Sequence, residues 1–380
     1  MHIVLAPNSF KNSLPADEVA KALKEGLLAS GLYCTLKTCP VGDGGDGTGA
    51  LLRKYFNTEN ITRQVFDPLG RLVNAVAGIT TDKQTAIIEL ADASGLRLLK
   101  PEEYNPLLAN TTGTGMLMKA ALDKKVSTIV LCIGGSATVD GGSGILRELG
   151  VVFRDDNDLE ITDLPKDLIR LKTIDLSGLD QRIFHTGIII LCDVKNKLLG
   201  DKGAARNFAP QKGASEEEVL YLENCLIKMK EAVAKATGKD MNDITHGGAS
   251  GGVAAGLWAV CGAKPVDGID YFLQQIRFEK VIRQADLIIT GEGALDAQTL
   301  DGKAPLGVAL AAIKNNIPVY AVAGKIEESA RKQLSKYFDR LICINDSKAS
   351  QKEALKDTKI NLKSTAEKIG RSLLHGFIND

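Results

Sequence analysis

Glycine-rich loops, several of them directly after short apolar runs, constrain the fold of this chain more than any other feature of its sequence. They are GDGGDG (42–47), TTGTG (111–115), GGSATVDGG (134–142), GGASGG (247–252) and TGEG (290–293). The loops recur without a fixed period, which argues against a solenoid of repeats. Large α/β proteins need glycine turns in any case, but glycine also lets the backbone approach a ligand closely. Because open α/β sheets bind ligands at the carboxyl ends of their strands, the loops predict a ligand-binding α/β protein.

The first part of the chain has the order expected of a parallel sheet covered by helices. Residues 2–6 form a short apolar strand, and residues 13–30 follow with apolar side chains at helical spacing and Ser13 as the predicted N-cap. A second strand then leads into the loop at 42–47. Strand, helix and strand in this order predict a mostly parallel sheet.

The middle of the chain has a different pattern. Residues 61–90 alternate between polar and apolar side chains around a D-P-L-G turn, which is typical of hairpins, and residues 215–238 predict a long helix capped by Ser215. Three strand-and-helix units close the chain. We expect an α/β fold in which a Rossmann-like, doubly wound domain (1–60 plus 286–380) carries an inserted, hairpin-containing α/β domain (61–285). We expect the active site in the cleft between the two domains.

Composition excludes several classes of partner. Lys plus Arg and Asp plus Glu number 47 each, so no excess of one charge points to nucleic acid or to an anionic membrane. No apolar run approaches the roughly 20 residues of a spanning helix, and the N-terminus does not have the pattern of a signal peptide. The seven cysteines lack a C-x-x-C pair and predict reduced, mostly buried thiols. We therefore expect a cytoplasmic protein, either a monomer or a homodimer.

The loop at 42–47 combines two signals that conflict. Gly42, Gly44 and Gly47 have the G-x-G-x-x-G spacing of a dinucleotide-binding turn, but Asp43 and Asp46 lie inside it. Two carboxylates would repel a pyrophosphate at close range. NAD binding is thus a minority interpretation, and no P-loop sequence is present.

Carboxylates and isolated lysines in or near the other loops indicate a different use. Such carboxylates can hold Mg²⁺, accept a substrate hydroxyl or take its proton, while lysines neutralise phosphoryl charge. For any single aspartate a turn or cap role is about as probable as catalysis. The residues concerned are Asp140, Asp193, Glu292, Asp296, Lys11, Lys212 and Lys303.

Along most of its length the sequence resembles the bacterial glycerate kinases of glycolate and glucarate catabolism. In family order, the stretches that carry the resemblance are APNSFKNSL, VGDGGDGT, ELADASGL, NPLLANTTGTG, IGGSATVDGGSG, CDVKN, APQKGAS and TGEGALDAQTLDGKAP. The run IPVYAVAGK extends it past residue 320. Three positions depart from the family pattern: Asn8 and Lys195 stand where the family usually has Asp, and Asp46 where it usually has Glu.

The resemblance implies two α/β domains and a kinase that phosphorylates D-glycerate with ATP and Mg²⁺. We favour the 2-hydroxyl as acceptor, because the family is credited with that regiochemistry. Lys11 would neutralise the moving phosphoryl group, and Asp193 would orient the hydroxyl as its base. The expected substrate-binding residues are Ser9, Asp43, Gly44, Gly45, Ser136 and Asp140. The expected nucleotide-binding residues are Gly134, Gly135, Gly291, Glu292, Gly293, Asp296 and Lys303, and Asp193 and Asp43 are the expected Mg²⁺ ligands.

Three alternatives stay open at this point. A kinase could act on the 3-hydroxyl of glycerate or on another small hydroxy acid. A non-catalytic regulator could keep the fold and bind a small ligand. A dinucleotide-dependent oxidoreductase could use the loop at 42–47.

Overall fold

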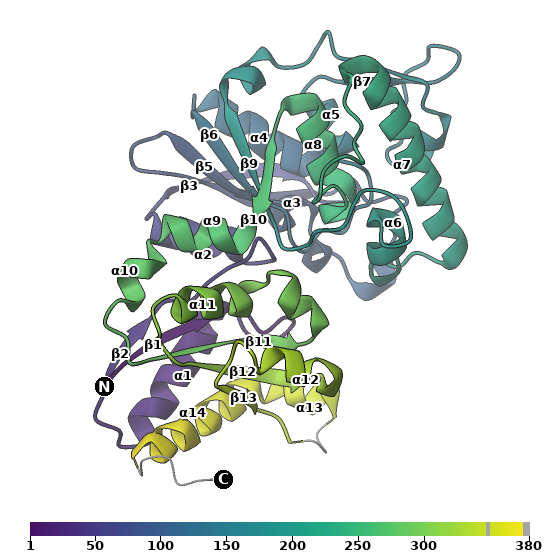
Figure 1. Cartoon of the computed structure of the whole chain (residues 1–380). Helices are drawn as coiled ribbons and strands as arrows, with labels where there is room; N and C mark the ends of the chain where they lie inside the picture. The colour runs from purple at the N-terminus through teal and green to yellow at the C-terminus, as the bar shows by residue number, and fades with distance from the viewer. Residues whose placement is uncertain (347–349, 375–380) are drawn as a thin grey trace. The chain divides into compact units, whose positions relative to one another are not determined.

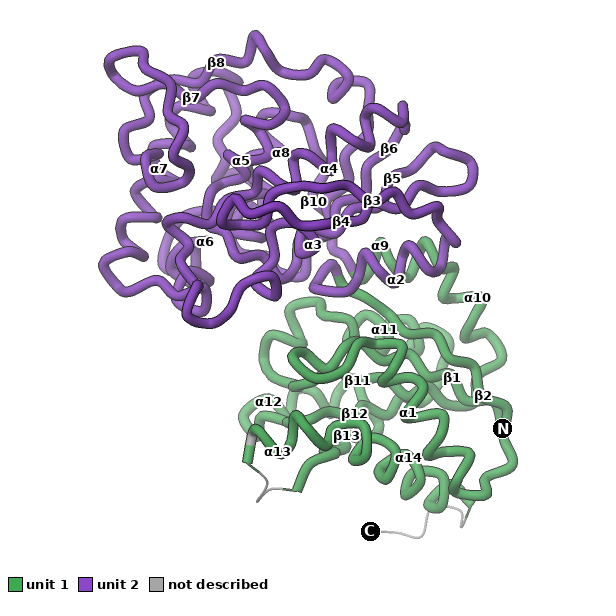
Figure 2. Tube along the Cα trace, turned by 180° about the vertical axis from the view of Figure 1, so that it is seen from behind, with its two compact units in different colours: residues 1–43, 269–380 green, residues 44–268 purple. Residues whose placement is uncertain are grey.

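The structure, a computed structural model, describes residues 1–346 and 350–374. The chain divides into two compact units: residues 1–43 with 269–380 form unit 1, and residues 44–268 form unit 2 (Figure 2). The boundaries expected from sequence, after residue 60 and before residue 286, lie further along the chain than these. That the units act as independent domains with the active site between them stays a prediction.

Unit 1 is built on a parallel sheet in the order β13-β12-β11-β1-β2. Its strands are β1 (His2–Pro7), β2 (Thr35–Thr38), β11 (Leu287–Leu295), β12 (Val319–Ile326) and β13 (Arg340–Cys343). The first halves of the central strands β1, β11 and β12 are mostly apolar and buried, as expected of strands covered on both faces. The predicted parallel, doubly wound sheet is confirmed.

Helices cover both faces of this sheet. Helix α11 lies on one face, and α1 and α14 lie side by side on the other (Figure 1). The helices of unit 1 are α1 (Ala16–Ala29), α9 (Gly268–Gln275), α10 (Phe278–Ile282), α11 (Ala304–Ile313), α12 (Glu328–Leu334), α13 (Gln351–Lys356) and α14 (Thr358–Leu374). The predicted N-cap of the first helix is wrong, because Pro15 holds that position and the Ser13 hydroxyl donates to the Leu355 carbonyl.

Unit 2 contains a mixed sheet in the order β10-β9-β6-β5-β4-β3. The predicted hairpins are confirmed, because β3, β4 and β5 pair antiparallel, whereas β5, β6, β9 and β10 run parallel. The strands are β3 (Glu59–Phe66), β4 (Leu72–Ile79), β5 (Thr85–Glu89), β6 (Thr128–Cys132), β9 (Gly187–Cys192) and β10 (Lys264–Asp267). A separate antiparallel pair consists of β7 (Val152–Arg154) and β8 (Thr173–Asp175).

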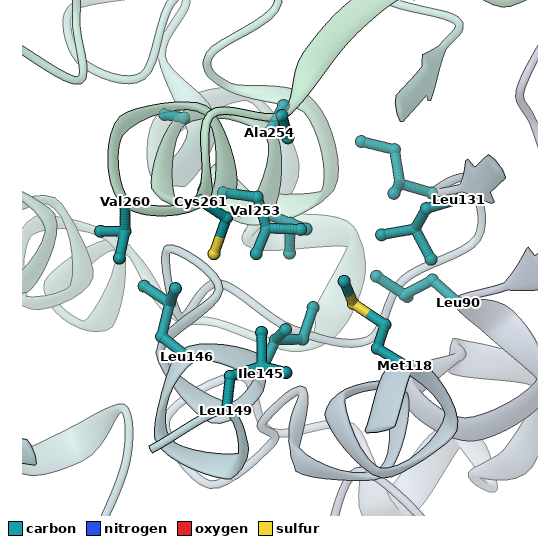
Figure 3. Close-up of a cluster of buried hydrophobic side chains, with 14 of the residues drawn as sticks. Leu90, Met118, Leu131, Ile145, Leu146, Leu149, Val253, Ala254, Val260 and Cys261 are labelled. Atoms are coloured by element: carbon teal, nitrogen blue, oxygen red, sulfur yellow. The ribbon is translucent and has the colours of Figure 1, made fainter. Parts of the chain in front are cut away.

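The helices of unit 2 pack around a large apolar core. Leu90, Met118, Leu131, Ile145 and Val253 contribute to it (Figure 3). The helices are α2 (Thr48–Tyr55), α3 (Ala91–Ser94), α4 (Thr112–Asp123), α5 (Ser143–Glu148), α6 (Ala204–Phe208), α7 (Glu216–Thr237) and α8 (Val253–Cys261). Helix α7 begins with the predicted cap, in which Ser215 accepts from Glu218 N–H and Glu218 accepts from Ser215 N–H. Across the described residues, no helix has the length and apolar character needed to cross a membrane.

Candidate active site

Unit 1 gathers polar residues at the carboxyl ends of β1 and β11. These neighbouring strands flank the point where the strand order reverses, which is where open α/β sheets bind ligands. Asn8 N–H donates to the Gly291 carbonyl at 2.8 Å, so the segment after β1 stays beside β11. At Gly293 a Cβ atom would lie 3.3 Å from the backbone nitrogen of Lys11, and glycine therefore allows the two segments to approach closely. Lys11 itself is exposed at this edge.

Asp43 lies in the same polar group, at the N-terminus of α11. Its Oδ2 atom accepts from Asn8 Nδ2 at 3.0 Å and from the backbone N–H of Ala304 at 3.3 Å. The Asn8 Oδ1 atom accepts from Ser9 N–H at 2.7 Å, which fixes the direction of the amide. An aspartate at position 8 would instead place a second carboxylate against Asp43. The departure from the family pattern at this position is therefore compatible with the geometry.

Glu292 is a second buried carboxylate of this group, and only 7% of its surface is exposed. Thr299 Oγ1 donates to its Oε1 at 2.8 Å. Burial raises the pKa of Glu292 to about 7, Lys303 lowers it in part, and Asp43 adds to the rise. Asp296 caps the short helix η7 (Ala297–Asp301) and lies 3.9 Å from Lys303 Nζ. A pKa near neutrality lets Glu292 hold or release a proton at working pH.

Unit 2 places a second set of residues at the carboxyl ends of β5, β6 and β9. The loop from Gly44 onward packs directly on β6 and β9 there. The Gly44 carbonyl accepts from Gly134 N–H at 2.9 Å, and a Cβ at Gly134 would lie 2.3 Å from the Gly45 Cα. At Gly44, with φ of +94°, a Cβ would lie 2.7 Å from the Leu191 carbonyl oxygen. These glycines therefore serve close backbone packing.

The N–H groups of this loop have partners inside the protein. Glu89, at the end of β5, accepts from the backbone N–H of Gly47 and, at 3.0 Å, from that of Ala50. Gly44 N–H donates to Thr48 Oγ1 at 3.1 Å. A glutamate carboxylate thus lies at the N-terminus of α2, where a dinucleotide pyrophosphate would bind. This arrangement argues against the NAD-binding interpretation of the G-x-G-x-x-G spacing.

Asp140 does not have the surroundings expected of a ligand-binding residue. It is fully buried and accepts from the Thr111 hydroxyl at 2.6 Å and from the backbone N–H groups of Thr111, Gly142 and Gly144. Four donors occupy the lone pairs of one carboxylate. Asp140 therefore holds the loop after β6 in place, and its expected role in binding the substrate stays a prediction.

Ser136 lies in the same loop and is contacted by a buried lysine. Lys212, in the turn η5 (Pro210–Lys212), donates from Nζ to Ser136 Oγ at 2.9 Å and to the Thr138 carbonyl at 2.7 Å. Because an ammonium group only donates, the Ser136 hydroxyl hydrogen points elsewhere. Gly135, beside Ser136, has a φ of +72°.

Asp193 follows β9 directly and is half-buried. Lys195, two residues after Asp193, pairs with Asp267, and its Nζ lies 3.3 Å from Asp267 Oδ1. The His246 Nε2 atom lies 3.8 Å from the same oxygen. The other nitrogen of His246 is 2.7 Å from the Val194 carbonyl. Lys195 is thus paired with Asp267, at a position where the family usually has an acid.

The expected site residues therefore fall into two groups. Unit 1 holds Ser9, Lys11, Asp43, Gly291, Glu292, Gly293, Asp296 and Lys303. Unit 2 holds Gly44, Gly45, Gly134, Gly135, Ser136, Asp140 and Asp193. Sequence reasoning missed Glu89 and His246 and did not assign a role to Lys212. The stretches ELADASGL and APQKGAS contain Glu89 and Lys212, so the resemblance offered a signal for both.

Carboxylates that could bind Mg²⁺ occur in both units. Residues 1–346 and 350–374 contain no group of three or more His, Cys, Asp and Glu that could hold a metal ion. Kinase Mg²⁺ commonly has only one or two carboxylate ligands, with water and substrate phosphates completing its octahedron. Asp43 of unit 1 and Asp193 of unit 2 are carboxylates of the kind that such an ion binds, and their role as Mg²⁺ ligands stays a prediction.

Comparison with known proteins identifies the family. The sequence profile described as the glycerate kinase family matches residues 3–374. The chain belongs to the glycerate kinase family. It is 38% identical over 379 residues to the glycerate 2-kinase of Escherichia coli (strain K12), with 100% of both chains covered. It is 38% identical over 373 residues to the glycerate kinase of Bacillus subtilis (strain 168), with 98% of each covered.

A solved structure agrees with this assignment. The crystal structure of a protein assigned as glycerate kinase 2 from Salmonella typhimurium LT2 is similar with a TM-score of 0.81 at 38% identity. The similarity covers 99% of each chain. As a member of this kinase family the chain uses ATP and acts on a small molecule, and the predicted α/β fold class is confirmed.

Proposed function

We propose that this chain transfers the γ-phosphoryl group of ATP to the 2-hydroxyl of D-glycerate and produces 2-phosphoglycerate. The observation that carries the proposal is membership of the glycerate kinase family along the whole chain, with a full-length relative named glycerate 2-kinase. The carboxylates and lysines at the strand ends of both units suit such a transfer, which depends on positioning and charge neutralisation.

The proposed roles follow the chemistry of the side chains. Asp193 orients the 2-hydroxyl and takes its proton as the oxygen attacks the γ-phosphorus and the bond to ADP breaks. Lys11 neutralises the charge of the phosphoryl group in transit. Asp43 of unit 1 and Asp193 of unit 2 are each proposed as Mg²⁺ ligands, and the ion would supply further neutralisation. These roles rest on residue type and strand-end position.

Substrate and nucleotide are assigned to separate sets of groups. Ser9, Asp43, Gly44, Gly45 and Ser136 are proposed to bind glycerate, with Ser136 donating its hydroxyl hydrogen to the carboxylate. The nucleotide phosphates are assigned to the backbone N–H groups of Gly134, Gly135, Gly291 and Gly293, and to Glu292, Asp296 and Lys303. Glu292 would contribute through Mg²⁺ or a ribose hydroxyl, because an ionised carboxylate repels phosphate.

Substrate profiling tests the proposal. The purified chain, with ATP and Mg²⁺, is offered D-glycerate, L-glycerate, D-lactate and 3-hydroxypropionate, and ADP is measured directly by chromatography. D-Lactate lacks the 3-hydroxyl and 3-hydroxypropionate lacks the 2-hydroxyl. We expect kcat/KM to be highest for D-glycerate by at least about tenfold, because a site that hydrogen-bonds a hydroxyl rejects analogues without it. A higher kcat/KM for another acid would contradict the proposed substrate.

The main alternative is transfer to the 3-hydroxyl of the same acid. A 3-kinase would belong to the same family and would need the same charged groups. Only the position of the phosphate in the product therefore distinguishes it from a 2-kinase. A non-catalytic regulator is the alternative from another class, and it predicts no ADP with any of the four acids.

A further inference from the structure

Glu89 is a buried carboxylate to which the proposed reaction assigns no role. It is the last residue of β5, and 1% of its surface is exposed. Side chains alternate along a strand, so Glu89 and Ile87 face away from Ile88, which joins the large core of unit 2. The helix on the Glu89 side is α2, which packs on β5.

The carboxylate of Glu89 lies at the N-terminus of α2. One oxygen accepts from Gly47 N–H, and the other accepts from Ala50 N–H at 3.0 Å. A Cβ at Gly49 would lie 2.8 Å from the Glu89 Cβ and 3.0 Å from its Oε2, so only glycine leaves room for the carboxylate there. The N-terminus of a helix attracts negative charge, and this one is occupied by the protein's own carboxylate.

The same loop is fixed at its other end by the strand ends that carry the proposed chemistry. The Gly44 carbonyl accepts from Gly134 N–H at 2.9 Å, and the Gly44 backbone touches Leu191 and Cys192, directly before Asp193. Glu89 therefore holds Gly47, at one end of the 44–47 loop. Gly44, at the other end, contacts two of the segments that are proposed to bind ligands. A shift of the loop at Gly47 would displace both of these segments, the one at Gly134 and the one before Asp193.

Charged groups from several elements surround Glu89. Arg53 of α2 lies 3.1 Å from Asp92 of α3, and Arg97 lies 3.3 Å from Asp46 of the loop. Desolvation, together with Asp92 and Asp46, raises the pKa of Glu89 to about 7, while the Gly47 hydrogen bond and Arg97 lower it. The Cys132 thiol of β6 also faces this group, but burial keeps its pKa well above the ordinary value, so it stays neutral. The surroundings of Glu89 thus bring its pKa close to neutral pH.

We propose that Glu89 is a positioning residue for phosphoryl transfer, and that its ionised carboxylate holds the 44–47 loop against the ends of β6 and β9. When the carboxylate is protonated, one oxygen becomes an O–H donor opposite an N–H donor, and the loop is held less firmly. This inference rests on the proposed function, because the loop matters only if the strand ends bind the reactants.

The test compares pH profiles of kcat for the wild type, Glu89→Gln and a control, Glu223→Gln. Glu223 is also a buried glutamate of unit 2 that accepts a backbone N–H, from Gly200 at 3.0 Å, but it lies outside the proposed site. Because the pKa of Glu89 is about 7, we expect kcat of the wild type and of the control to rise about tenfold from pH 6 to pH 8. Glu89→Gln should lose this rise and stay at or below the low-pH kcat, while KM for ATP changes less than about threefold.

Two further measurements keep the inference testable if Glu89→Gln folds poorly. Arg97 is partly exposed, so Arg97→Gln should fold, and it should move the midpoint of the kcat profile to higher pH because a neighbouring positive charge is removed. Hydrogen exchange of a peptide covering residues 44–52 should be faster in Glu89→Gln than in Glu223→Gln, and this readout needs no catalysis.

The outcomes separate this inference from the proposed function. If the wild type does not phosphorylate glycerate, the proposed function is wrong, and hydrogen exchange alone then decides whether Glu89 holds the loop. If the wild type is active but Glu89→Gln keeps the wild-type pH rise, or Arg97→Gln leaves its midpoint unchanged, Glu89 is not a positioning residue. Equal hydrogen exchange of residues 44–52 in Glu89→Gln and Glu223→Gln would overturn the inference as well.

Discussion

At the scale of single residues, Asp43 is held by two donors within unit 1. The Asn8 amide and the Ala304 N–H, at the first residue of α11, both donate to its Oδ2 atom. The N-terminus of α11 thus lies beside this carboxylate. A substrate hydroxyl or Mg²⁺ would therefore meet a negatively charged group that is already oriented.

The substitution Asp43→Asn tests this residue. It keeps the shape but removes the charge, while the amide oxygen can still accept from Asn8 and Ala304, whose hydrogen bonds both go to one oxygen of Asp43. We expect kcat for glycerate phosphorylation to fall about 100-fold or more, with circular dichroism unchanged. Asp82→Asn, at an exposed hairpin turn, is the matched control and should behave as the wild type. Normal turnover by Asp43→Asn would show that the proposed role is wrong.

Residue types supplied the candidate site residues, whose roles stay predictions, and the hydrogen-bond partners of these residues were not predictable. The sequence indicates Asp140 as an acid in a glycine-rich loop, whereas Glu89 ends an apolar strand and has no such local signal. Only the fold shows that Asp140 accepts two hydrogen bonds from Thr111 besides those from Gly142 and Gly144, and that Glu89 lies under α2. Those contacts join residues far apart in the chain, and no local pattern specifies them.

At the scale of elements, the order of strands, glycine loops and helices was predictable because each is a local pattern. The Ser215 cap of α7 was also predictable, since a serine before three glutamates matches the helix dipole and the capping box. The N-cap of the first helix was not predicted correctly as Ser13. Pro15 occupies that position in an extended conformation, and the helix begins at Ala16. The reason for the glycines at 44 and 134 lies in contacts between segments and could not come from the sequence.

The close packing of the glycine loop predicts the effect of a single methyl group. In Gly134→Ala the new Cβ would lie 2.3 Å from the Gly45 Cα, so the two segments must separate and the Gly134 to Gly44 hydrogen bond must lengthen. We expect a loss of about 1–3 kcal/mol in the free energy of unfolding, the usual cost of overpacking. Urea denaturation measures it.

Gly187→Ala is the matched control for this prediction. Its Cβ would have no neighbour nearer than 3.7 Å, and its stability should stay within about 0.5 kcal/mol of the wild type. Equal stability of the two variants would show that the loop does not pack on β6 as described.

At the scale of the whole molecule, each unit carries one buried glutamate that titrates near neutral pH. Burial raises the pKa of both Glu89 and Glu292 from 4.5 to about 7. A carboxyl group whose pKa is higher in the folded state favours folding at low pH, and that contribution is lost as pH rises from about 4.5 through 7. Both groups therefore oppose folding once they are ionised.

This linkage predicts how substitution changes stability with pH. Glu292→Gln stays neutral, so its free energy of unfolding relative to the wild type should increase by roughly 3 kcal/mol between pH 5 and pH 8. Urea denaturation of both proteins at the two pH values measures the difference. Glu148→Gln, whose glutamate forms a partly exposed pair with Lys119, is the control and should show little change. A constant difference for Glu292→Gln would mean that Glu292 titrates normally.

The division of the chain was only roughly predictable from sequence. The first boundary lies inside the glycine loop, between Asp43 and Gly44, because α2 packs on β5 of unit 2 rather than on the sheet of unit 1. Nothing in the local pattern of residues 44–60 specifies which sheet α2 covers. The class of fold and the order of its strands depend on local periodicity, whereas the boundaries depend on this packing choice.

The position of the phosphate in the product tests the central claim most directly. The purified chain is incubated with ATP, Mg²⁺ and D-glycerate, and enolase is then added without phosphoglycerate mutase. Because enolase accepts only the 2-phosphate, we predict that phosphoenolpyruvate forms at once. Formation only after the mutase is added would identify a 3-kinase and contradict the account, and no formation in either case, with an active enolase control, would contradict glycerate as the substrate.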